Sequence, residues 1–169
     1  TTTGIELRWT DTPITYYINA NGAPQIPNGS EFLAVHAAFD AWENVPSAAV
    51  DFDFGGTTPL RSVGRDGLNV ITFADDSGLL GSQTLAATFS FINHSNGVLE
   101  ESDIAFNPNH DFSTSGEEDK FDIQSVVTHE VGHMLGLDHS GVVSSVMGPF
   151  AAVTQVFQRV LQYDDIAGV

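Results

Sequence analysis

Three histidines and one glutamate lie close together in the segment from His129 to His139. If the first part of this segment is helical, His129 and His133 are one turn apart and project from the same face. Gly136 then allows a sharp turn that returns His139 to the same place. Three imidazoles can hold one zinc ion and leave its fourth coordination position open. That is the pattern of a catalytic zinc site, because structural sites normally have four protein ligands.

Glu130 lies beside these ligands and is better placed to act on a water at the open position than to bond the metal. Zinc lowers the pKa of such a water to about 7 and polarises a carbonyl group. Glu130 would take the proton of the attacking water and pass it to the departing amine, as amide hydrolysis requires. Two other interpretations remain, namely helix-surface histidines that bind no metal and a zinc ion that only stabilises the fold.

The composition limits the classes of protein to consider. The chain has 169 residues, which suits one domain, and 22 Asp and Glu against 5 Lys and Arg give a formal charge of −17. Nucleic acids and anionic membrane surfaces need basic partners, so neither is expected to bind. No apolar run is long enough for membrane insertion, and the absence of cysteine excludes disulfides and thiolate metal sites. Because the chain begins at Thr1 without a leader pattern, we expect a processed fragment.

Hydrophobic spacing predicts two main helices and several strands. Ser30 is expected to cap the first helix, where apolar residues recur at helical spacing as far as Trp42. Asp122 is expected to cap the second helix, from Ile123 to about Leu135. Short runs rich in β-branched and aromatic residues predict strands at residues 14–18, 50–54, 69–73, 85–92 and 102–106, with Gly55 ending the second of them. This order of elements indicates an α+β fold with helices packed on a twisted, mixed sheet.

The histidine segment matches the HExxHxxGxxH motif, and the chain thereby resembles the metzincin clan of zinc endopeptidases. Met147 is similar to the methionine of the clan's Met-turn, which lies beneath the metal. Ser140 follows the third histidine and Pro149 follows the Met-turn, as in the matrixins, which are the matrix metalloproteinases and their bacterial relatives. Weaker similarity to the matrixin first helix, edge strand and C-terminal helix is found at residues 38–45, 85–89 and 164–166.

The resemblance implies a zincin-like catalytic domain with a mostly parallel sheet and one antiparallel edge strand. The sheet would pack on a long first helix and on the active-site helix. The chain would be a single domain over residues 1–169, with an upper subdomain at 1–139. A lower subdomain at 140–169 would contain the Met-turn and a truncated C-terminal helix. The implied protein is a secreted, monomeric zinc endopeptidase that cleaves internal bonds of extended proteins or peptides.

The resemblance also implies where a substrate lies. A peptide would add along the edge strand, and a pocket beside the metal helix would receive the side chain after the scissile bond. Ser125 is small, so this pocket is expected to be open to a medium or large apolar side chain. The expected substrate-binding residues are Leu85, Ala86, Ala87, Ser125, Pro149 and Phe150.

Other metal sites of the matrixins are not expected. Ala87 and Ala105 occupy positions where matrixins usually have histidines for a second, structural zinc. A calcium site of the family falls at Asn107 and His110, which lack its acidic ligands. Asp75 and Asp76 offer oxygen ligands for calcium, although solvated carboxylates are the favoured interpretation. Of the remaining histidines, His36 is expected to be structural, whereas His94 and His110 are expected to be solvated loop residues.

Two other functions compete with the endopeptidase. One is a catalytically silent module of the matrixin fold that binds or inhibits, against which the intact Glu130 argues. The other is a zinc amidase or exopeptidase. It would need a charged group that recognises a chain terminus, and the scarcity of Lys and Arg near the motif gives no support for one.

Overall fold

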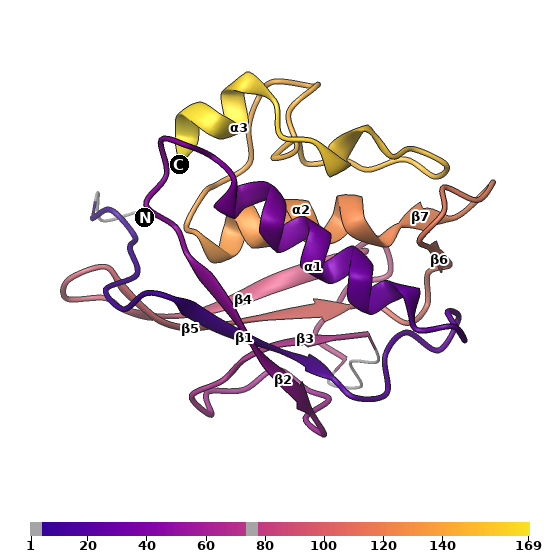
Figure 1. The fold of residues 1–169 in the computed structure, drawn as a ribbon, viewed down its shortest axis with the longest axis horizontal. Coiled ribbons are helices and arrows are strands. Elements are labelled where there is room, and N and C mark those ends of the chain that lie inside the picture. The colour runs from indigo at the N-terminus through magenta and orange to yellow at the C-terminus, as the bar shows by residue number, and fades with distance from the viewer. Residues whose placement is uncertain (1–4, 74–77) are drawn as a thin grey trace.

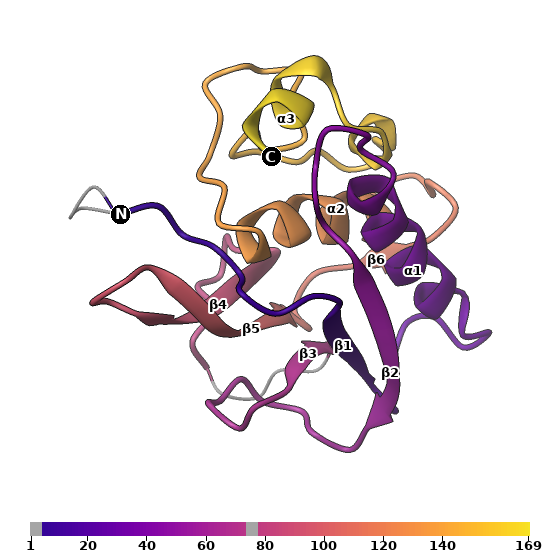
Figure 2. The ribbon, with the colours of Figure 1, turned by 60° about the vertical axis from the view of Figure 1, so that its left-hand side comes forward.

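The computed structural model describes residues 5–73 and 78–169 (Figures 1 and 2). In chain order the elements are β1 (Ile14–Asn19), α1 (Ser30–Glu43), β2 (Phe52–Thr58), β3 (Asn69–Thr72), β4 (Ala86–Asn93), β5 (Val98–Phe106), β6 (Phe112–Ser113), β7 (Phe121–Asp122), α2 (Ile123–Met134), the 3₁₀ helix η1 (Phe157–Arg159) and α3 (Tyr163–Gly168). Among the described residues, no helix has the length and apolar character needed to cross a bilayer.

Five strands form one sheet in the order β2-β1-β3-β5-β4. All neighbours are parallel except β4, which runs antiparallel to β5 and forms one edge. The expected mostly parallel sheet with an antiparallel edge strand is thereby confirmed. In Figures 1 and 2 the helices α1 and α2 lie over one face of this sheet, and the segment containing α3 lies on the far side of the helices.

The core is built where the apolar faces of α1, α2 and the sheet meet. On α1 the buried residues recur at helical spacing and end at Trp42. The indole Nε1 of Trp42 donates a hydrogen bond of 2.8 Å to the backbone oxygen of Thr128, which fixes α1 against α2. Phe39 stacks on Tyr16 of β1 with ring centroids 3.8 Å apart, so α1 also contacts the sheet.

The expected ends of the helices are partly confirmed. Asp122 caps α2, because its carboxylate accepts a hydrogen bond of 2.8 Å from the backbone N–H of Ser125. The prediction that Ser30 caps α1 is wrong. Gly29 occupies that position with a φ of 72°, which glycine adopts without strain, and Ser30 is the first helical residue. The Ser30 hydroxyl instead donates to the side chain of Asn28.

The prediction that Gly55 ends the second strand is wrong, because β2 continues to Thr58. The pairing of β1 with β2 shifts register there, so Gly55 is an extra residue that a β-bulge accommodates. A Cβ at Gly55 would lie 2.4 Å from the ring of Tyr17, which shows why glycine is required. Phe54 lies on this edge strand, and 40% of the residue is exposed.

The strand expected at residues 102–106 begins earlier than predicted. β5 starts at Val98, because β4 and β5 form a hairpin in which Asn93 pairs with Val98. His36 has the structural position expected for it. The ring is half-buried on α1, and its Nδ1 lies 2.5 Å from the Tyr16 hydroxyl.

Candidate metal centre

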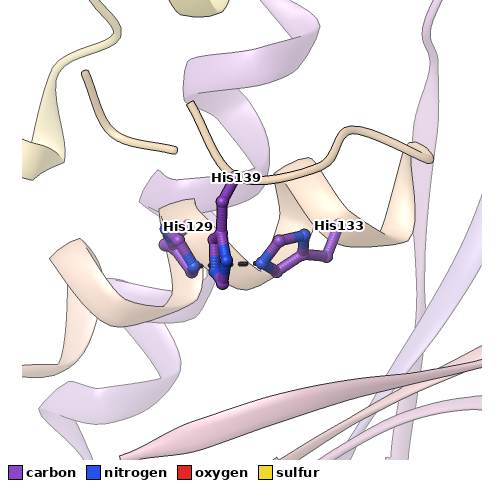
Figure 3. Close-up of side chains that lie close together, drawn as sticks. All are labelled: His129, His133 and His139. Carbon is purple, nitrogen blue, oxygen red and sulfur yellow. Dashed lines mark hydrogen bonds between the residues drawn. The ribbon is translucent and has the colours of Figure 1, made fainter. Parts of the chain in front are cut away.

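The three histidines of the motif converge on one place. His129 and His133 come from successive turns of α2, and His139 returns from the segment after Gly136, whose φ is 95° (Figure 3). One nitrogen from each ring can be chosen so that all three lie within 4.8 Å of one another. Together these residues could hold a metal ion.

Hydrogen bonds to backbone carbonyls orient two of the rings. The Nδ1 atom of His129 lies 2.7 Å from the oxygen of Val146, and that of His133 lies 2.8 Å from the oxygen of Leu137. Because a carbonyl only accepts, each Nδ1 carries the proton, and each Nε2 therefore presents a lone pair. Such contacts fix the tautomer and orientation of metal-binding imidazoles in general.

The donor set fits zinc. The Nε2 atoms of His129 and His133 face each other at 3.0 Å. Two lone pairs at this distance repel each other unless a cation lies between them, and two nitrogens of a tetrahedral zinc site are about 3.3 Å apart. Burial lowers the pKa of His129 to about 4 and also lowers the pKa of His139. At neutral pH these imidazoles are therefore free of the proton that would compete with a metal ion.

Glu130 lies next to this cluster and is only 5% exposed. Its carboxylate oxygen Oε2 accepts a hydrogen bond of 2.7 Å from the hydroxyl of Thr88 on β4. Burial raises the pKa of the carboxyl group, while the Thr88 hydrogen bond opposes that shift. A buried carboxylate beside a cation site has the chemistry of a general base.

A cleft of about 800 Å³ joins the histidines to the edge strand. It is lined by the three histidines, Glu130 and all six residues expected to bind substrate, namely Leu85, Ala86, Ala87, Ser125, Pro149 and Phe150. Their positions agree with the sequence-based prediction, and their role in binding stays a prediction. The Ser125 hydroxyl donates to the carboxylate of Asp122, and the same carboxylate forms an ion pair with the Arg159 guanidinium of η1. These contacts hold this wall of the cleft against η1.

His110 also lines the cleft, so the expectation that it is a solvated loop residue is wrong. The ring packs edge-on against Phe121 with centroids 5.8 Å apart, and its Nε2 atom is buried without a hydrogen-bond partner in the described part of the chain. His94 is exposed, as expected. Asp75 and Asp76, the expected oxygen ligands for calcium, lie outside the described residues.

Met147 is 2% exposed and packs against α2, and its support of a bound metal stays a prediction. A Cβ at Gly132 would lie 2.2 Å from the Met147 sulfur and 2.9 Å from the ring of Trp42. Gly132 therefore lets the methionine approach α2 closely. Sequence reasoning missed this residue, although a glycine inside a helix is unfavourable by roughly 1 kcal/mol and so signals a packing requirement.

Asp165 is a second residue that sequence reasoning missed, because the sequence marks it only as part of a short helix. It is 2% exposed, and its carboxylate accepts hydrogen bonds from the Ser145 hydroxyl at 2.8 Å and from the backbone N–H groups of Val146 at 2.9 Å and Met147 at 3.0 Å. The carbonyl of Val146 in turn orients His129. Asp165 thus supports both the turn at Met147 and, through the Val146 carbonyl, the ring of His129.

Comparison with known proteins agrees with this geometry. The family model described as matrixin matches residues 8–169. The chain belongs to the matrixin family. At family level this supports a zinc metalloendopeptidase, and it confirms the resemblance and the fold class inferred from the sequence.

Three matrixin relatives show how far the similarity extends. Matrix metalloproteinase-16 of Homo sapiens is 30% identical over 174 residues, covering 96% of this chain and 26% of the relative. Interstitial collagenase A of Mus musculus is 31% identical, covering 94% of this chain and 32% of the relative. Matrilysin of Rattus norvegicus is 44% identical over 59 residues, covering 35% of this chain and 22% of the relative. The chain thus spans about a third or less of the length of these relatives.

The lowered pKa of His129 predicts how the stability of the metal-free protein depends on pH. The folded state binds this proton less tightly than the unfolded state, whose histidine has the ordinary pKa of 6.5. The contribution of His129 is therefore full above pH 6.5 and is lost as the pH falls towards 4. The free energy of unfolding, measured with urea, can be plotted against pH between pH 7 and pH 4. His129→Gln should reduce the slope of this plot by at most about 1.4 kcal/mol per pH unit. His94→Gln, at an exposed position, serves as the comparison for loss of a histidine, and a slope for His129→Gln equal to that of wild type would contradict the assignment.

Asp165→Asn tests the support beneath the metal centre. The amide has one accepting oxygen in place of two, so backbone donors of the Met-turn lose a buried partner. We expect a loss of about 2–4 kcal/mol in the free energy of unfolding and at least a tenfold weaker affinity for zinc. Asp164→Asn is the matched control, because Asp164 is exposed and accepts from the Ser140 hydroxyl outside the turn. Similar losses for the two variants would refute the role given to Asp165.

Proposed function

We propose that this matrixin domain is a zinc-dependent endopeptidase that cleaves internal bonds of extended protein or peptide substrates. The observation that carries the proposal is the convergence of three imidazoles within 4.8 Å, beside the buried carboxylate of Glu130, in a cleft bordered by the edge strand β4. His129, His133 and His139 would hold the metal. Met147 would support it by packing, without acting as a ligand.

The edge strand supports binding of an extended chain. β4 pairs with β5 on one side and ends the sheet on the other, so its outer backbone groups are available to a substrate strand. We propose that Leu85, Ala86 and Ala87 form this contact. The substrate side chain after the scissile bond would enter between Ser125 and the segment from Pro149 to Phe150, in a cleft whose lining as a whole is more apolar than polar.

The lining of the cleft also supports an endopeptidase over an exopeptidase. An enzyme that removes terminal residues needs a charge that pairs with the terminal ammonium or carboxylate group. Among the described residues that line the cleft there is no Lys, Arg or Asp, and the one Glu is Glu130. This lining favours a substrate that passes through the cleft without a terminal charge to be recognised.

In the proposed reaction, bound zinc supplies a Lewis acid that polarises the scissile carbonyl and acidifies water. Glu130 removes a proton from the water that attacks the carbonyl carbon, and then delivers it to the amide nitrogen as the C–N bond breaks. Burial raises the pKa of Glu130, which helps the carboxyl group to hold the proton between these two transfers. The products are one new carboxylate and one new amine.

We further propose that the chain is a single catalytic domain, with an upper part at residues 1–139 and a lower part at 140–169, which acts as a monomer outside the cell. The support for an extracellular location is family membership and the name of one relative, interstitial collagenase. Calcium and a second zinc are not part of the proposal. In register, Ala87 pairs with Ala105, which brings two side chains without donor atoms together.

Glu130→Gln tests the reaction directly. The amide keeps the shape of the side chain but cannot accept the proton, so kcat on a quenched fluorescent peptide should fall about 10²- to 10⁴-fold. Zinc content should remain one per chain. Glu100→Gln is a control outside the cleft, because the Glu100 carboxylate pairs with Arg65 at the surface. A wild-type protein that holds zinc but cleaves no peptide, with or without chelator, would favour the silent binding module instead.

A further inference from the structure

One contact of the proposed general base comes from the sheet and not from the metal ligands. The Thr88 hydroxyl lies 2.7 Å from the carboxylate oxygen Oε2 of Glu130 and 2.9 Å from the backbone oxygen of the same residue. A hydroxyl has one proton to donate, so this proton is directed at Glu130 whichever oxygen accepts it. The bond to Oε2 is charge-assisted and is the stronger of the two when the carboxyl group is ionised.

The strand fixes the position of this hydroxyl. Thr88 is the third residue of β4 and pairs in register with Ile104, which is fully buried in β5. A β-branched side chain has few χ1 rotamers, so the strand backbone largely determines where the oxygen lies. The side chain of Glu130, in contrast, has a terminal torsion with a broad energy minimum. A donor held rigidly by the sheet can restrain that torsion.

We infer that Thr88 is a positioning residue for the general base, and this inference rests on the proposed endopeptidase function. Its hydroxyl holds Oε2 against β4 and leaves Oε1 to receive the proton of the attacking water. The same strand borders the cleft in which the substrate would lie. A single element would thus align both the peptide and the carboxylate that acts on it.

Two substitutions separate the hydroxyl from the shape of the side chain. Thr88→Val keeps the branched shape and removes the donor, whereas Thr88→Ser keeps the donor. Misplacement of a reacting group by about 1 Å can lower the reaction rate about 10²-fold. Thr88→Val should therefore lower kcat about 10- to 100-fold, with KM changed less than about twofold. Thr88→Ser should stay within about threefold of wild type. The stoichiometry and affinity of zinc should be the same in all three proteins.

Thr72→Val is the matched control. Thr72 is a buried threonine of β3. Its hydroxyl donates to the backbone oxygen of Arg61 and not to Glu130. Removal of the Thr72 hydroxyl should leave kcat and KM unchanged, even if the protein becomes less stable. An unchanged kcat for Thr88→Val, or an equal loss for Thr88→Val and Thr88→Ser, would overturn the inference while wild-type activity upholds the proposed function.

A second measurement does not depend on activity. In the metal-free protein, Thr88→Val should lower the midpoint of urea unfolding in the wild-type background and lower it less in a Glu130→Ala background, where the carboxylate is absent. Equal shifts in both backgrounds would show that the hydroxyl does not hold the carboxylate, and would overturn the inference. If wild type cleaves no peptide, the proposed function fails, and the positioning role fails with it even where the coupling to Glu130 is present.

Discussion

The candidate metal centre depends on the Nε2 atoms of His129 and His133 being held 3.0 Å apart and facing each other. This arrangement is unfavourable for the protein alone, so other contacts must impose it. The carbonyls of Val146 and Leu137 do so, because each accepts a hydrogen bond from the Nδ1–H group of one histidine. Much of the surrounding structure then keeps these two carbonyls in a fixed position relative to α2.

Two buried carboxylates serve this arrangement in different ways. Asp165 is surrounded by donors from the Met-turn, so it acts as a structural acceptor that holds the Val146 carbonyl in place. Glu130 lies next to the sheet and lines the cleft. Thr88 is its partner on β4. The number and origin of hydrogen-bond donors thus distinguish a carboxylate that stabilises the turn from one that can exchange a proton.

The sequence predicts local features better than tertiary ones. Helical spacing and turn chemistry place His129, His133 and His139 correctly, because those signals lie within eleven consecutive residues. The bulge at Gly55 could not be predicted, since it depends on the ring of Tyr17 in the neighbouring strand. The roles of Asp165 and Thr88 were missed for the same reason. Each depends on contacts between segments far apart in the chain, which carry no local pattern.

X-ray absorption at the zinc edge of the purified, zinc-loaded protein tests the central claim most directly. The account predicts one zinc per chain, with three imidazole nitrogens at about 2.0–2.1 Å and one oxygen from water completing the shell. A fourth protein ligand would close the position that hydrolysis needs. That result, or a protein that retains no zinc at neutral pH, would contradict the account.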